Sequence, residues 1–250
     1  MIGPKDVPHK PPGIWKSAAG LALFVLYMLL AACRQPTPET LPAAEILERS
    51  IGRMKLVSGF HFLIERSGAP AYLDWQQSLS LRRMEGDYVA PDRAQASVRV
   101  IAPGIVAEIR IVSIGNVQWE TNPITGEWEQ LPPDWGFNPT LLFDPQVGLQ
   151  RILEQDLSNL ALLDVVELEE MPGILLYSLV GDLDGERIAE MSFGLMGPQP
   201  MRVQLWIAPG SFDLHRILIT EEAIEDAEPT IWQVDFWNID DTVEIQPPPV

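Results

Sequence analysis

The chain has 250 residues, of which 46% are hydrophobic, and its 35 Asp and Glu outnumber its 17 Lys and Arg to give a formal net charge of −18. This hydrophobic content excludes a wholly disordered protein, and the length suffices for one sizeable core. Nucleic acid is excluded as a partner, because phosphate binding requires clusters of Lys and Arg that this sequence lacks. The single cysteine, Cys33, excludes an intramolecular disulfide and a zinc site built from cysteines.

The first 33 residues have the pattern of a lipoprotein signal peptide. Three lysines before residue 17 form a basic segment, and residues 17–32 form an uncharged run, which is shorter than the roughly 20 apolar residues that span a bilayer. The run ends in Leu30-Ala31-Ala32-Cys33, which resembles the lipobox of bacterial lipoproteins, where the cysteine is lipidated and becomes the new N-terminus. The alternative is an uncleaved anchor in which Cys33 has no role.

We therefore expect three parts. Residues 1–32 are the signal peptide, residues 33–40 are the lipidated Cys33 with a Pro-rich tether, and residues 41–250 form a single domain. Two or more acyl chains on one residue give stable anchoring. The domain is accordingly expected to be extracytoplasmic, anchored by lipid to the outer face of the cell membrane.

The domain is predicted to begin with a helix and to continue with strands. Thr40 is expected to cap the helix, whose apolar face is formed at helical spacing by Ala44, Leu47, Ile51, Met54 and Ser58. After Gly59 the hydrophobic period changes to two. Strands are predicted over residues 60–65, 77–83, 94–101, 105–114, 117–121, 127–131, 161–168, 174–181, 201–208, 214–220 and 231–237.

Two further short helices are expected, over residues 144–156 and 186–194. The gaps between strands carry turn residues, as in Ala102-Pro103-Gly104, and are too short for helical crossovers. The sequence therefore predicts a mainly β (α+β) protein with a large curved antiparallel sheet.

Several of these strands are apolar on both faces. In residues 105–114 one face is wholly apolar, and the other mixes Val106, Val112 and Ile114 with two charged residues. An apolar second face must be covered by helices or filled by an apolar ligand. A solid core completed by the helices is the alternative that this pattern leaves open.

From about residue 40 to 248 the sequence resembles the LppX/LprAFG lipoproteins of bacterial envelopes. The segments that carry the resemblance are residues 88–96, 119–128, 142–145, 204–207 and 243–248. The resemblance implies a half-open antiparallel β-barrel with two or three helices packed in its concave mouth, similar to the Lol lipoprotein carriers. It also implies an apolar cavity for the acyl chains of lipids or glycolipids, and a role in moving them across the envelope. No binding residue can be carried over from the family.

Two sets of residues are candidates for the cavity and its entrance. On the first helix the candidates are Leu47, Ile51 and Met54. The segment 128–137 contains prolines and a glycine that keep it out of a regular ladder, and its Leu131, Trp135 and Phe137 could cover a cavity entrance or touch a bilayer. A loop packed on its own sheet is the alternative.

Catalytic and metal-binding motifs are lacking. The sequence has no GxSxG, HExxH or Gly-rich phosphate loop. His61 and His215 alternate with apolar residues on predicted strands, which favours structural roles. Asp182-Leu183-Asp184-Gly185 starts like a calcium loop but lacks the other ligands, so a β-turn is predicted. We expect a protein that is not an enzyme and has neither cofactor nor metal.

The preferred function is that of a membrane-anchored lipid carrier. A bilayer offers an acyl chain the same apolar environment as a cavity, so net transfer is expected to need a partner such as an envelope transporter. Two alternatives remain open: a chaperone for lipidated proteins or envelope assembly factor, and a ligand-free sensor or structural module.

Replacing Cys33 with Ser should release the protein from membranes, because the lipid is the anchor that the sequence predicts. Fractionation of cells into membrane and soluble parts, followed by washing without detergent, measures the release. A variant that stays in the washed membranes would show that residues 17–32 are an uncleaved anchor.

Overall fold

The computed structural model describes residues 39–73, 76–132, 138–192, 194–222, 228–241 and 243–249. Three α-helices and one 3₁₀ helix occur in these residues: α2 (Ala43–Met54), η1 (Pro139–Phe143), α3 (Leu149–Gln155) and α4 (Gly185–Met191). The strands are β1 (Gly59–Ser67), β2 (Ala71–Tyr72), β3 (Ser80–Val89), β4 (Arg93–Ala102), β5 (Ile105–Ile114), β6 (Val117–Thr121), β7 (Trp128–Gln130), β8 (Leu157–Val166), β9 (Leu176–Leu183), β10 (Met201–Ile207), β11 (Leu214–Glu221) and β12 (Thr230–Trp237).

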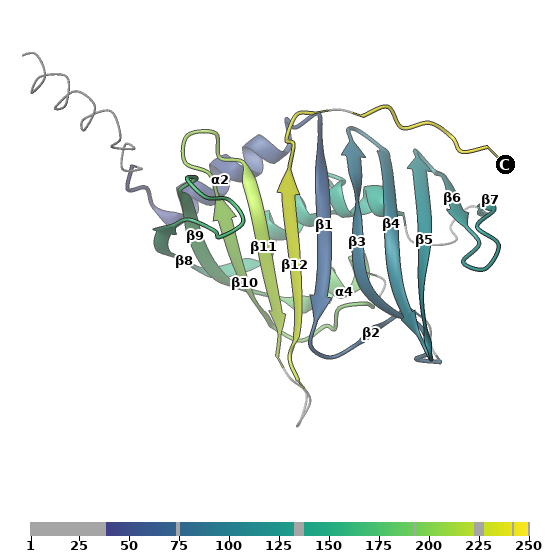
Figure 1. Cartoon of the computed structure of the whole chain (residues 1–250). Helices are drawn as coiled ribbons and strands as arrows, with labels where there is room; N and C mark the ends of the chain where they lie inside the picture. The colour runs from purple at the N-terminus through teal and green to yellow at the C-terminus, as the bar shows by residue number, and fades with distance from the viewer. Residues whose placement is uncertain are drawn as a thin grey trace, which may run out of the picture. The chain divides into compact units, whose positions relative to one another are not determined.

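The strands form one open antiparallel sheet of 12 strands (Figure 1). Its order is β7-β6-β5-β4-β3-β1-β12-β11-β10-β9-β8, and β2 pairs with β3 beside this path. The first and last strands of the domain, β1 and β12, pair at the centre and join the two halves of the sheet. The sheet is not closed into a barrel, which confirms the mainly β fold and the half-open barrel implied by the resemblance.

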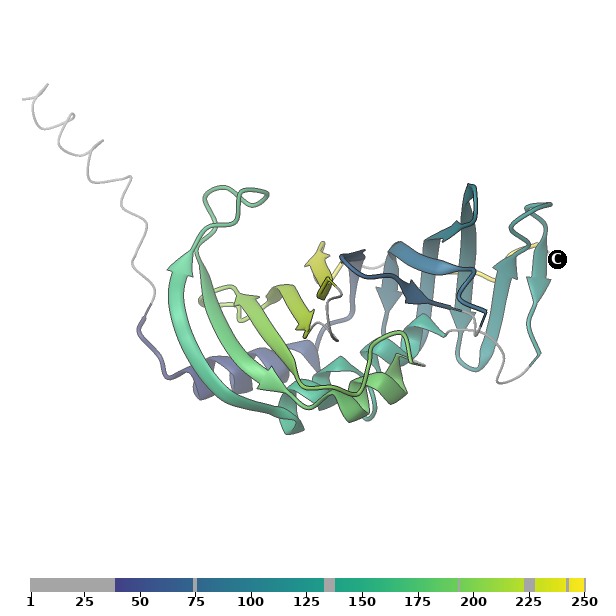
Figure 2. The same ribbon diagram turned by 90° about the horizontal axis from the view of Figure 1, so that it is seen from below.

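The helices lie along one face of the curved sheet, which we call the inner face (Figure 2). Strand pairing aligns a row of apolar side chains across nine strands of this face. In spatial order the row is Leu162, Leu179, Leu205, Ile217, Val234, Ile64, Met84, Val98 and Ile109. Since side chains alternate between faces along each strand, the whole row points toward the helices.

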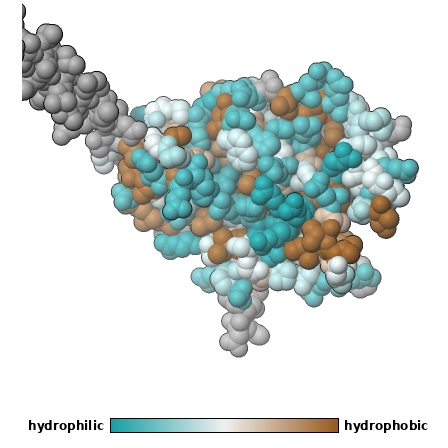
Figure 3. Space-filling view, viewed as in Figure 1, coloured by the Kyte–Doolittle hydropathy of each residue, from teal (hydrophilic) through white to brown (hydrophobic). Residues whose placement is uncertain are grey.

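The opposite face of the sheet, the outer face, is polar at its centre (Figure 3). Here Arg83 pairs with Glu65 and Glu85 at 2.7 and 2.8 Å, and His61 Nδ1 lies 2.7 Å from Asp87 Oδ1. A hydrophobic area remains at the end where β4 joins β5, where Val106 is 65% exposed. Partly exposed pairs of this kind add at most about 1 kcal/mol each, so the apolar inner face supplies most of the stability of the sheet.

The helix boundaries differ from those predicted. Helix α2 begins at Ala43 after Pro42, with no side-chain cap, so Thr40 does not cap it. Its buried face is centred on Ile46, Ser50 and Ile51, with Leu47 and Met54 at the sides. The predicted apolar face was therefore wrong at both ends, because Ala44 is exposed and Ser58 lies after the end of the helix.

Helices α3 and α4 are shorter than the segments expected to form them. The Asp144 side chain accepts hydrogen bonds from the N–H groups of Gln146 and Val147, which holds a turn where the start of a helix was predicted. Asp184 accepts from Glu186 N at 3.1 Å and caps α4. The prediction of a β-turn over residues 182–185 was therefore wrong, because this segment ends β9 and starts a helix.

Ile217→Ala should destabilise the protein by about 3 kcal/mol, because Ile217 is fully buried in the inner row and its loss leaves a cavity. The control is Ile124→Ala, at a position that is 92% exposed, which should change stability by less than about 0.5 kcal/mol. Urea unfolding of the two variants measures the difference. Equal effects would contradict the placement of Ile217 in the core.

Candidate functional site

In the part of the chain that the structure describes, three apolar spaces lie along the inner face, two of them beneath the helices. The α2 cavity, about 30 Å³, is lined by Met54, Val57 and Phe60 together with Arg53 and Asp213 at its rim. The central cavity, about 60 Å³, lies beneath α4. The β4 groove, about 460 Å³, lies over β3, β4 and β5. The lining of the central cavity includes Ile64, Met84, Ile219, Trp232 and Val234 from the sheet and Ile188, Met191, Leu195 and Met196 from α4 and the segment after it.

The three spaces share walls and follow one line across the inner face. Phe143 and Leu149 line both the α2 cavity and the central cavity. Leu81, Met84 and Leu195 line both the central cavity and the β4 groove. Movement of these few side chains would therefore join the spaces into one continuous apolar channel.

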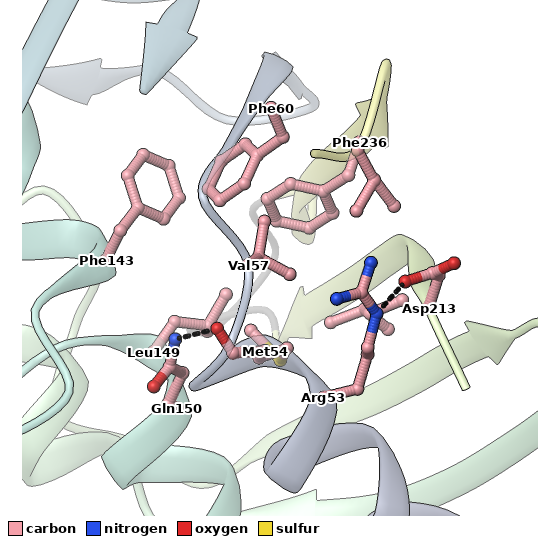
Figure 4. A pocket seen from close by; sticks show the side chains of 11 residues that line it. Arg53, Met54, Val57, Phe60, Phe143, Leu149, Gln150, Asp213 and Phe236 are labelled. Carbon is pink, nitrogen blue, oxygen red and sulfur yellow. Dashed lines mark hydrogen bonds and ion pairs between the residues drawn. The ribbon is translucent and has the colours of Figure 1, made fainter. Parts of the chain in front are cut away.

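Phe143 separates the α2 cavity from the central cavity. It lies at the end of η1 and is 3% exposed, and its ring centroid is 4.9 Å from that of Phe60 and 5.0 Å from that of Phe62. Figure 4 shows the rings of Phe60, Phe143 and Phe236 around the α2 cavity. Phe143 comes from a short 3₁₀ helix and its ring partners come from strands, so the wall between the two spaces is formed where η1 packs against the sheet.

A polar rim closes the α2 cavity at the C-terminal end of α2. Arg53 Nε donates to Asp213 Oδ1 at 2.7 Å (Figure 4), and the same guanidinium pairs with Asp240. The guanidinium holds the pKa of the Asp240 carboxyl below its ordinary value through this hydrogen bond. Beside it, Gln150 Nε2 donates to the carbonyl of Met54 at 3.1 Å. These contacts join α2 to α3 and to the loop between β10 and β11.

A buried carboxylate holds the segment after α4 against the sheet. Glu221 accepts hydrogen bonds from Trp232 Nε1 at 2.6 Å, from Gly197 N at 2.9 Å and from Gln199 Nε2 at 2.9 Å. The fixed segment presents Met196 to the central cavity, next to Met191 at the end of α4. Methionine side chains adapt to irregular apolar shapes, so this wall can change shape while its anchor stays in place.

The β4 groove differs from the other two spaces because it is larger and contains an acidic group. Glu120 of β6 lines it, and burial raises the pKa of this carboxyl above its ordinary value, with a smaller contribution from Glu129. At about 460 Å³ the groove falls within the range of ligand pockets, which is about 300–1,000 Å³.

The structure places some of the predicted site residues at these spaces. Met54 lines the α2 cavity. Ile51 is buried and Leu47 packs beside it, but neither lines the three spaces. Leu131 is half-buried and its N–H donates to the carbonyl of Gln118 at 2.9 Å. Cys33, Trp135 and Phe137 lie outside the described residues.

The side chains of β3, β4 and β5 that line the groove were not singled out from the sequence. The alternation of hydrophobic residues over 105–114 could have identified part of this lining, because Ile109 and Ile111 lie on the apolar face of that strand and both line the groove. Phe143 had no such signal, since it ends a short 3₁₀ helix in which hydrophobic residues do not alternate.

His61 and His215, the histidines among the described residues, lie away from the three spaces. His61 belongs to the polar network of the outer face, and burial lowers the pKa of His215, which is half-buried on β11. Within the part of the chain that the structure describes, no group of three or more His, Cys, Asp or Glu could hold a metal ion. Within the same part, no helix is long and apolar enough to cross a membrane.

Comparison with known proteins supports the fold. The model of the family described as LppX_LprAFG lipoprotein matches residues 42–245. The crystal structure of LprF from Mycobacterium bovis superposes with a TM-score of 0.63 at 16% identity, covering 84% of this chain and 99% of LprF. The crystal structure of the Mycobacterium tuberculosis lipoprotein LppX superposes with a TM-score of 0.57 at 15% identity, covering 82% of this chain and 98% of LppX. No curated protein matches the sequence.

Glu120→Gln should stabilise the protein at pH 7 and have little effect below about pH 4. Burial raises the pKa of Glu120 in the folded state above 4.5, so ionisation costs the folded state more free energy than the unfolded state. The stability of the wild-type protein therefore falls as the pH rises from the unfolded-state pKa through the folded-state pKa. Below about pH 4 the carboxyl is protonated in both states, and the difference disappears.

Urea unfolding at pH 4 and pH 7 tests this expectation, with Glu108→Gln as a control because Glu108 is exposed on β5. An equal gain for Glu120→Gln at both pH values would contradict the buried position of the carboxyl.

Proposed function

The chain belongs to the LppX_LprAFG lipoprotein family, and we propose that it binds the acyl chains of a lipid or glycolipid along its inner face and carries them across the cell envelope. The observation that carries the proposal is the line of three apolar spaces with shared walls along the inner face of the sheet. In this proposal Cys33 holds the protein on the outer face of the cell membrane, and an envelope transporter supplies or receives the lipid.

The driving force is the removal of acyl chains from water. Each methylene that moves into an apolar environment contributes about 0.8 kcal/mol, so one sixteen-carbon chain gains on the order of 10 kcal/mol before ordering costs. A membrane offers the same gain. The cavity therefore makes transfer feasible but does not give it a direction, and the direction must come from a partner or a lipid gradient.

Entry is proposed at the β4 groove, which is the largest of the three spaces. The central and α2 cavities, at about 60 and 30 Å³, must widen to admit more of a chain. The side chains that would move are Phe143, Met191 and Met196, which come from helices and the segment after α4. The segment 131–137, with Trp135 and Phe137, is proposed as a lid over the entrance.

Native mass spectrometry of the full-length protein, extracted from membranes in detergent, tests the proposal. A non-covalently bound diacyl lipid or glycolipid that leaves at higher collision energy is the expected result. A bound lipopeptide would identify a chaperone for lipidated proteins instead. A protein that carries only its covalent anchor, even after incubation with lipids, would contradict lipid binding.

Ile109→Trp should reduce the fraction of protein that carries lipid by about tenfold, because Ile109 is half-buried on the inner face and a larger side chain would fill the β4 groove. The space is open, so unfolding stability should change by less than about 1 kcal/mol.

The matched control is Val106→Trp, which places the same ring on the outer face of the same strand, where Val106 is 65% exposed. It should leave occupancy unchanged. Equal lipid occupancy of both variants by native mass spectrometry would exclude the groove as the binding site.

A further inference from the structure

The β4 groove has one charged residue in its lining. Of the eleven described residues that line it, Glu120 alone is charged, and the others are aliphatic, aromatic or methionine side chains. Pairing places Glu120 opposite Ile111 of β5, and Ile111 opposite Ala96 of β4, so all three share the inner face. An ionisable group at this place is costly unless it has a partner.

The described residues include no cation that pairs with Glu120. Its neighbour on the same face, Glu129 of β7, is also acidic and raises the pKa of the Glu120 carboxyl further. Among the described residues, no hydrogen bond reaches the Glu120 carboxylate. It is therefore an acceptor that faces the groove.

The arginines of the neighbouring strands are directed elsewhere. Arg83 of β3 pairs with Glu65 and Glu85 on the outer face, and the guanidinium of Arg110 lies 5.1 Å from the ring of Trp128. Arg66, the buried arginine at the end of β1, donates to the carbonyls of Leu81 and Gly68 at 2.7 and 3.0 Å. The described residues that line the groove include no arginine or lysine, so none of them would neutralise a phosphate.

We propose that the β4 groove holds the head group of the lipid and that Glu120 selects an uncharged, hydroxyl-bearing head group over an anionic phosphate. This inference rests on the proposed function and names the class of lipid that the same site accepts. A hydroxyl group donates a charge-assisted hydrogen bond to a carboxylate, whereas a phosphodiester offers no donor and repels the carboxylate. The repulsion is strong because the groove is partly shielded from water.

The position of Glu120 also orients the ligand. Leu81, Met84 and Leu195 lead from the groove to the central cavity and are apolar throughout. A head group at Glu120 would therefore place the acyl chains along the inner row, toward α4 and Phe143.

A competition experiment tests the inference. The full-length protein in detergent is incubated with equimolar dioleoylglycerol and dioleoylphosphatidylglycerol, and the bound lipids are counted by native mass spectrometry. The two lipids have identical acyl chains and both carry free hydroxyls, so the comparison isolates the charge of the phosphodiester. Dioleoylglycerol should predominate on the wild-type protein. In Glu120→Gln this preference should fall about tenfold, because the like-charge repulsion is removed.

The matched control is Glu108→Gln, which makes the same change of charge on β5 at an exposed position. It should keep the wild-type preference. Equal shifts in both variants, or a wild-type protein without preference, would overturn the role of Glu120 and leave lipid binding intact. A wild-type protein that binds neither lipid would overturn the proposed function, and the choice of head group with it.

Discussion

The structure depends on the apolar inner face of an open sheet. Nine strands contribute to a single row of apolar side chains, and such a surface cannot remain in contact with water. In a closed barrel the row would be filled by its own side chains. Here the sheet stays open, so three short helices and a 3₁₀ helix cover the row. Short helices cannot fill a curved surface completely, and the spaces beneath them become the candidate site.

Polar anchors hold this cover in place at its edges. Arg53 joins α2 to the loop after β10 through Asp213, and Glu221 joins the segment after α4 to the sheet through three hydrogen bonds. Between these anchors the contacts are those of Phe143 and of methionines, which have no directional requirement. A cover fixed at its edges and adaptable at its centre suits a ligand made of flexible acyl chains.

Charge is distributed unevenly over the sheet. The outer face carries the ion pairs of Arg83 and Arg216, whereas Glu120 is the single charged residue among the described residues that line the β4 groove. The formal net charge of −18 makes the protein a poor partner for anionic surfaces in general. In our proposal Glu120 extends the same preference to the inside of the groove, where partial burial weakens screening by salt.

The sequence by itself determined the fold class and most of the strands. Alternation and turn residues are local features, so residues 105–114 and 117–121 were predicted with the boundaries that the structure has. Helix ends were less predictable, because Asp144 and Asp184 act through side-chain hydrogen bonds whose partners depend on the local turn. Only the tertiary structure decided which residues form the site. Phe143 partitions the spaces because η1 lies against strands from distant parts of the sequence, and Glu120 faces the groove because the register of β6 sets it opposite Ile111. Register and the docking of η1 are long-range outcomes of packing, which a local pattern does not encode.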